Sequence, residues 1–204
     1  RKADIYVDES GFIAVDEYMR THVKDIFAVG DCAQKRDFVT RARVSTMLAS
    51  TACAEARIAG MNLFNLNVVK TFSGTIAIYS TAVGNTGFGT AGITEARAKE
   101  EGIDTITGTF EGVDRHPGNL PDAHKQLVKL IAARQSGVII GGEVIGGLSA
   151  GELTNVLGLI IQNRMSVNSL LTSQIGTHPC LTASPAGYPL IKAAEQIAFK
   201  MRNR

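Results

Sequence analysis

The chain has 204 residues, of which 45% are hydrophobic and 20% are charged, and its formal net charge at pH 7 is +2. A chain of this length and composition can form one large globular domain or two small ones. The small net charge gives no argument for nucleic acid or an anionic membrane as a partner, and we expect neither. No apolar run of about 18 residues and no signal peptide are recognisable, so we expect a soluble, cytoplasmic protein.

The sequence has three cysteines, Cys32, Cys53 and Cys180, and none of them forms a Cys-x-x-Cys pair. An odd number fits a reducing compartment, and we expect these thiols to lie in the core. The four histidines are isolated from one another, so their spacing does not suit a metal. No metal site is predicted.

The first part of the chain predicts short strands and a turn that carries a carboxylate. Two apolar runs flank the turn 8–11 and are strand candidates. The apolar segment 26–29, followed by Gly30 and Asp31, predicts a buried strand with a carboxylate at its C-terminal edge. Glycine permits close approach to the backbone there, and aspartate can accept hydrogen bonds from ligand hydroxyls. An ordinary strand-terminating turn is the alternative interpretation.

A long helix is predicted from about Arg43 to Leu63. Apolar residues recur in it at near-helical spacing: Val44, Met47, Leu48, Ala52 and Ile58. Its many small residues permit close packing on a sheet. Beyond it the pattern changes to α+β, and we place a domain boundary between residues 66 and 67.

The second part of the chain predicts alternating strands and helices. A strand is expected near 72–79, a Gly/Thr-rich turn region over 81–92, and a helix over 95–101 with Thr94 as its cap. A further strand is expected near 105–110. The run 115–121 contains two prolines and a glycine, and predicts a loop.

The last third of the chain carries the clearest patterns. The segments 127–132 and 138–140 predict a hairpin around the turn 134–137. Ser149-x-x-Glu152 is typical of a capping box and opens a helix with an apolar stripe. A final helix is expected from about Tyr188.

Two segments of the first part together carry a resemblance to a known family. Residues 21–31 follow the pattern Thr-x-x-x-x-Ile-Phe-Ala-x-Gly-Asp, and Leu48-Ala49-Ser50-Thr51-Ala52 comes downstream. The succession resembles the pyridine nucleotide-disulfide oxidoreductases, and the nearest branch looks like the NADH oxidases and coenzyme A-disulfide reductases. The resemblance implies that Asp31, with Gly30, holds the ribityl chain of FAD. It also implies that the helix start near Ala49 and Ser50 faces the flavin ring.

The resemblance spans essentially the whole chain and implies its organisation. Residues 1–66 would be the C-terminal tail of an α/β FAD-binding domain, and residues 67–204 an α+β dimerisation domain. The Gly-x-Gly-x-x-Gly turn, the redox cysteine and the NAD domain of this family are not found in the sequence. We therefore expect the C-terminal part of a longer FAD-dependent homodimer that uses NADH or NADPH to reduce oxygen, a peroxide or a disulfide. The alternative is an assembly module without activity of its own.

The pair His178-Pro179 is a second candidate site. In the glutathione reductase branch, a His-Pro pair near the C-terminus crosses the dimer interface and acts as an acid–base group, oriented by a glutamate five residues later. Here that position is Ala183. Two interpretations stay open for His178: a catalytic residue that lines the partner's active site, or a histidine hydrogen-bonded in a loop.

Overall fold

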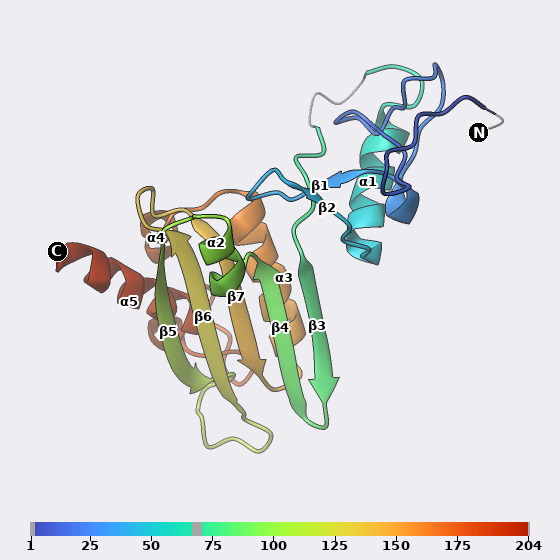
Figure 1. Ribbon diagram of the computed structural model, residues 1–204. Coiled ribbons are helices and arrows are strands. Elements are labelled where there is room, and N and C mark those ends of the chain that lie inside the picture. The colour runs from blue at the N-terminus through green and yellow to red at the C-terminus, as the bar shows by residue number, and fades with distance from the viewer. Residues whose placement is uncertain (1–2, 67–70, 204) are drawn as a thin grey trace. The chain divides into compact units, whose positions relative to one another are not determined.

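The computed structural model describes residues 3–66 and 71–203 (Figure 1). The chain divides into two compact units, unit 1 (Arg1–Ala77) and unit 2 (Ile78–Arg204). Helices and strands are mixed, which confirms the predicted α+β class. The predicted boundary between residues 66 and 67 adjoins 67–70, which lie outside the described residues.

Unit 1 is built from a few short elements. They are the 3-10 turn η1 (Gly30–Cys32), the antiparallel strands β1 (Lys35–Arg36) and β2 (Arg43–Val44), and the helix α1 (Ala49–Met61). The predicted strands before Gly30 form only isolated bridges, such as Arg20 with Phe27. The prediction was wrong because aspartate side chains there bond backbone N–H groups and so favour turns. Asp8 accepts from Ser10 and Phe12, and Asp16 from Tyr18 and Arg20.

Helix α1 begins six residues later than predicted. Arg43 and Val44 pair with β1 instead, and Leu48, the N-cap residue, is extended with φ −130°. The buried face of the helix is also different from the predicted stripe: it carries Thr51, Glu55 and Ala59, whereas Met47 is 58% exposed.

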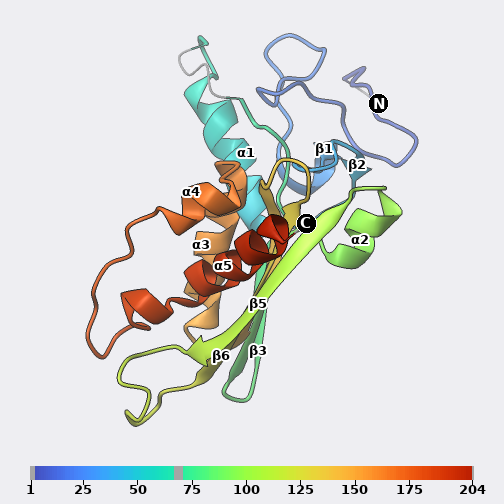
Figure 2. The same cartoon turned by 90° about the vertical axis from the view of Figure 1, so that its left-hand side faces the viewer.

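Unit 2 is an antiparallel five-stranded sheet of order β3-β4-β7-β6-β5. Its strands are β3 (Ile78–Val83), β4 (Thr86–Gly92), β5 (Thr105–Val113), β6 (Lys125–Ala133) and β7 (Ile139–Gly146). Its helices are α2 (Glu95–Glu100), α3 (Ala150–Gln162), α4 (Val167–Leu171) and α5 (Pro189–Arg202), with the 3-10 turn η2 (Pro185–Gly187). Helix α3 packs on β4 and β7, and α5 on β5 and β6, so both cover the same face (Figure 2).

Glycines on that face allow the two helices to lie close to the sheet. One row across the sheet reads Ile78, Ala91, Gly142, Leu130 and Gly108. A Cβ atom at Gly108 would come within 2.1 Å of the Ala193 carbonyl oxygen on α5, and one at Gly142 within 2.8 Å of Leu157 on α3. Small residues at these positions therefore set the distance between helices and sheet.

The β6–β7 hairpin, the α5 helix and the Thr94 cap, which accepts a hydrogen bond from the Arg97 N–H, are confirmed. The Gly/Thr-rich region 81–92 is a β-hairpin rather than a turn region, because its small residues fit the close-packed face. The prediction of a capping box at Ser149-x-x-Glu152 was wrong. Ser149 is in the αR conformation, and its hydroxyl donates to Asp114 Oδ2 at 3.3 Å.

The prediction that all three cysteines lie in the core is also wrong. Cys32, Cys53 and Cys180 are exposed free thiols. Cys32 follows Asp31 in the η1 turn, Cys53 faces away from the buried side of α1, and Cys180 lies in a loop with φ +64°.

Candidate functional site

The η1 turn presents a carboxylate on a backbone that glycine makes possible. Gly30 is buried and has φ +73°, a left-handed conformation that side chains disfavour. The turn is closed by the Ala33 N–H, which donates to the Gly30 carbonyl oxygen at 3.0 Å. The Asp31 side chain is exposed, and no residue in the described part of the chain donates a hydrogen bond to its carboxylate. Asp31 is thus an available acceptor.

A buried ion pair lies behind this turn. Glu55, on α1, and Lys35, on β1, have side chains that are 1% and 2% exposed, and Lys35 Nζ lies 3.3 Å from Glu55 Oε1. Glu55 Oε2 accepts a hydrogen bond from the Gly30 N–H at 2.7 Å. Lys35 donates to the carbonyl oxygen of Gly30 and, at 3.1 Å, to that of Ala33. The pair therefore holds both backbone polar groups of Gly30.

Burial dominates the electrostatics of Glu55. It raises the pKa of the Glu55 carboxyl, and the Gly30 N–H and the Lys35 charge oppose this shift only in part. The nearby Asp31 carboxylate adds to the rise in the Glu55 pKa. Our sequence reasoning missed Glu55 and Lys35. A single acidic residue in an alanine-rich helix was the available signal.

The start of α1 completes the candidate site. The Leu48 cap makes no side-chain hydrogen bond, so the N–H groups of the first turn lack a side-chain acceptor there. Ala49 and Ser50 are exposed. The ideal Cβ position of Gly30 lies 3.5 Å from Ala52 Cβ, which places the η1 turn against the first two turns of α1. The structure thus brings the predicted residues Gly30 and Asp31 close to the beginning of the helix.

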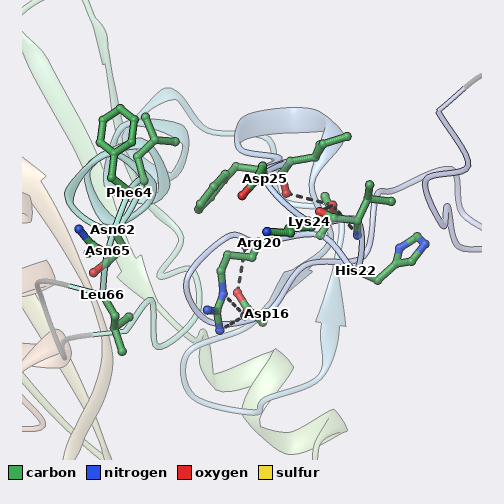
Figure 3. A pocket seen from close by; sticks show the side chains of 14 residues that line it. Asp16, Arg20, His22, Lys24, Asp25, Asn62, Phe64, Asn65 and Leu66 are labelled. Atoms are coloured by element: carbon green, nitrogen blue, oxygen red, sulfur yellow. Dashed lines mark hydrogen bonds and ion pairs between the residues drawn. The ribbon is translucent and has the colours of Figure 1, made fainter.

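A separate cleft of about 480 Å³ lies elsewhere in unit 1 (Figure 3). Its lining includes Arg20, His22, Lys24 and Asn62–Leu66, and none of the predicted site residues. Figure 3 shows Arg20 turned toward Asp16, to which it is paired at 2.7 Å. The positive charge of Arg20 is therefore already paired within the protein.

His178 belongs to unit 2 and lies in the exposed loop before η2. Its carbonyl oxygen accepts hydrogen bonds from Leu181 and Thr182, and the loop is joined to His116 by backbone hydrogen bonds. No carboxylate of the described residues pairs with its ring, and Ala183, at the position of the family's glutamate, is buried. Among the described residues of unit 2, none forms a side-chain hydrogen bond or ion pair that would orient His178 as an acid–base group.

In residues 3–66 and 71–203, no group of three His, Cys, Asp or Glu side chains is arranged to hold a metal ion. Over the same residues, every helix is too short or too polar to cross a bilayer.

Comparison with known proteins places these features in a family. The sequence profile described as pyridine nucleotide-disulphide oxidoreductase, dimerisation domain, matches residues 78–186. The profile described as pyridine nucleotide-disulphide oxidoreductase matches residues 1–56.

Individual relatives agree with these profiles. An NADH oxidase of Enterococcus faecalis is 30% identical over 171 residues, which cover 83% of this chain and 37% of that protein. An NADH oxidase of Methanocaldococcus jannaschii is 25% identical over 94% of this chain and 42% of its own length. The chain therefore spans well under half the length of these relatives.

Solved structures resemble the whole chain. The NAD-dependent persulfide reductase from A. fulgidus superposes with a TM-score of 0.84 and 30% identity, over 99% of this chain and 36% of that one. The water-forming NADH oxidase from Lactobacillus brevis, bound to NADH, gives a TM-score of 0.84 and 25% identity, over 99% and 44% of the two chains.

Proposed function

Because the chain belongs to the pyridine nucleotide-disulphide oxidoreductase family, we propose that it is the C-terminal part of an FAD-dependent oxidoreductase that uses NADH or NADPH. Residues 1–66 would complete the FAD-binding domain, and residues 67–204 would form the dimerisation domain. The matches of two family profiles, one to each part of the chain, support this division.

The residues around Asp31 suit FAD. The ribityl chain of FAD offers hydroxyl donors, and the exposed Asp31 carboxylate has no donor of its own among the described residues. The uncapped N-terminus of α1, with the small residues Ala49 and Ser50, suits the electron-rich edge of the flavin ring. Bound FAD would supply the electron-transfer chemistry, while these residues would bind and orient it. The unpartnered Asp31 carboxylate on the buried Gly30 turn is the observation that carries this proposal.

The names of the relatives indicate a class of reaction for the complete enzyme. Two of them are named NADH oxidase, and the persulfide reductase is named as NAD-dependent. We infer that the complete enzyme passes electrons from NADH or NADPH to a small acceptor: oxygen, a peroxide or a disulfide. Residues outside this chain would choose among these acceptors.

Unit 2 would supply a homodimer interface, as the description of the matched dimerisation domain suggests. A catalytic role for His178 stays a prediction with little support from its surroundings. We expect His178→Ala to leave the turnover of the full-length enzyme unchanged. A loss of about tenfold or more, with the dimer intact, would restore His178 as an acid–base group.

Equilibrium titration of the full-length apoprotein with FAD tests the proposed function. Asp31→Ala should weaken FAD binding by about 1.5–3 kcal/mol, because a charged acceptor is lost. Glu17→Gln removes an exposed carboxylate elsewhere in unit 1 and is the matched control. FAD binding that is absent from the wild type, or unchanged in Asp31→Ala, would contradict the proposal.

The 204-residue chain by itself offers a second test. We expect it to retain little or no FAD on purification, since it contains no glycine-rich phosphate-binding loop. A colourless dimer would match the part assigned to this chain. Stoichiometric flavin absorbance would show that this chain alone holds the main binding determinants.

A further inference from the structure

The Gly30 peptide is fixed from outside the turn. Glycine populates many backbone conformations, so its own preference does not select φ +73°. Glu55 accepts from the Gly30 N–H at 2.7 Å, and Lys35 donates to the Gly30 carbonyl oxygen. Glu55 is 25 residues away in sequence, on a different element. The conformation of the peptide that precedes Asp31 therefore depends on these two side chains.

A gain in folding stability is by itself a weak explanation for the buried ion pair of Glu55 and Lys35. Buried ion pairs recover their desolvation only when the geometry is excellent and every polar atom is bonded. Glu55 Oε1 makes no hydrogen bond in the described structure, although Lys35 Nζ lies 3.3 Å away. A shape-matched apolar pair at these positions would often fold as well or better. The charges of Glu55 and Lys35 are better explained by their hydrogen bonds to the N–H and the carbonyl oxygen of Gly30.

The charge of Glu55 also bears on Asp31. Both are carboxylates, and Asp31 lies close enough to affect the ionisation of Glu55. Like charges favour separation, so an ionised Glu55 behind the turn favours an outward Asp31 side chain. Lys35, bonded to Glu55 and to the carbonyl oxygens of Gly30 and Ala33, keeps that charge in place.

We propose that Glu55 is a positioning residue for the flavin site: together with Lys35 it fixes the Gly30 peptide and so presents the Asp31 carboxylate to the ribityl hydroxyls of FAD. This inference rests on the proposed function. Glu55 itself is fully buried, so it acts through the turn and not by touching the cofactor.

A double-mutant cycle on the full-length apoprotein tests the inference by FAD titration. Glu55→Gln keeps the shape of the side chain and removes its charge, and should raise the FAD dissociation constant about tenfold. If Glu55 acts through Asp31, adding Glu55→Gln to the Asp31→Ala variant should change the FAD dissociation constant by no more than about twofold. Ala59→Gly, on the buried face of the same helix, loses helix stability without touching the turn, and should leave FAD affinity unchanged.

The outcomes separate the inference from the proposed function. If Asp31→Ala weakens FAD binding and Glu55→Gln does not, the inference is wrong and the proposed function stands. An equal effect of Glu55→Gln with and without Asp31 would also overturn it. A wild type that binds no FAD would overturn both.

Two further measurements distinguish the loss of the contact with Gly30 from misfolding of the Glu55→Gln variant. Glu55→Asp keeps the charge for Lys35 but withdraws the oxygen from the Gly30 N–H, so it should also weaken FAD binding. Hydrogen exchange at the Gly30 amide should be faster in Glu55→Gln and Glu55→Asp than in the wild type or Ala59→Gly. Unchanged exchange together with unchanged affinity in Glu55→Asp would refute the positioning role.

Discussion

The hydroxyl oxygens of Thr51 and Thr75 lie 2.6 Å apart, and both side chains are buried. Thr51 is in the first turn of α1, and Thr75 pairs with Asp37 in a parallel bridge. Backbone hydrogen bonds join Thr75 to Arg36 and Phe38. The beginning of the helix beside the Asp31 turn is therefore tied to a segment more than 20 residues further along the chain.

A valine scan of this pair should show strong coupling. Either Thr51→Val or Thr75→Val leaves one buried hydroxyl without its partner, and should lower the free energy of unfolding by about 1–3 kcal/mol. The double variant removes both hydroxyls and should lose less than the sum of the two. Urea unfolding of the 204-residue chain measures the cycle, and additive losses would show that the two hydroxyls do not stabilise each other.

The Gly30 backbone can be tested against a second glycine of the same unit. Gly30→Ala meets only an ordinary contact, 3.5 Å from Ala52, so its loss of about 1–2 kcal/mol in stability should come from the left-handed backbone. Gly60→Ala, in α1 with nothing within 4 Å, should gain about 0.5–1 kcal/mol. Thermal unfolding compares the two, and a neutral Gly30→Ala would argue against a strained turn.

The close packing of α5 on the sheet makes Gly108 intolerant of a side chain. Gly108→Ala should lower the free energy of unfolding by about 1–3 kcal/mol, since the new Cβ would lie 2.1 Å from the Ala193 carbonyl oxygen. Gly151→Ala, on α3, meets nothing closer than 3.8 Å and serves as the matched control. Urea unfolding followed by circular dichroism compares the free energy of unfolding of the two variants. A Gly108→Ala protein as stable as the wild type would mean that the helix can shift freely.

The raised pKa of Glu55 predicts a pH dependence of stability. Burial raises the folded-state pKa above its unfolded value, so as pH rises the unfolded chain releases the proton first. The contribution of Glu55 to stability is therefore complete below the usual carboxyl pKa of about 4.3, and falls as pH rises through the raised value. Relative to Glu55→Gln, the wild type should lose stability as pH rises from about 4 through the raised pKa of Glu55.

Urea unfolding of both proteins across this range measures that difference. Glu17→Gln removes an exposed carboxylate of unit 1 and is the control for general charge effects. A wild type that gains stability relative to Glu55→Gln as pH rises would reverse the sign, and would mean that Lys35 and the Gly30 N–H outweigh burial.

Unit 2 should form a two-fold dimer. It leaves large apolar side chains exposed, among them Leu181 at 74% in the loop after His178 and Leu159 at 59% on α3. An obligate homodimer interface buries roughly 2,000 Å² or more of total accessible surface and is rich in apolar side chains. Sedimentation at micromolar concentration should give twice the 21.7 kDa mass of the chain, and a clean monomer would contradict this.

Leu181→Glu should weaken the dimer, because a charge would enter the apolar surface. Tyr6→Glu alters an exposed ring of unit 1 and should leave the mass unchanged. If the two substitutions behave alike, the loop after His178 is not part of the interface.

Local patterns in the sequence determined much of unit 2. The β6–β7 hairpin, the helix from Tyr188 and the Thr94 cap depend on neighbouring residues, and they form as predicted. The hairpin, the helix and the cap are local features, so the spacing of neighbouring residues predicts them. The candidate site came instead from the resemblance of residues 21–31 and 48–52 to a known family.

Tertiary structure alone decided which polar groups became buried. The sequence predicted an apolar stripe on α1, but the buried face carries Thr51 and Glu55, because their partners Thr75 and Lys35 come from distant segments. A buried charge is stable only where a counter-charge and hydrogen-bond donors converge on it, and no local pattern records that convergence. The sequence alone therefore indicates Asp31 as a candidate binding residue, whereas the ion pair of Glu55 and Lys35 behind it is recognisable only in the folded protein.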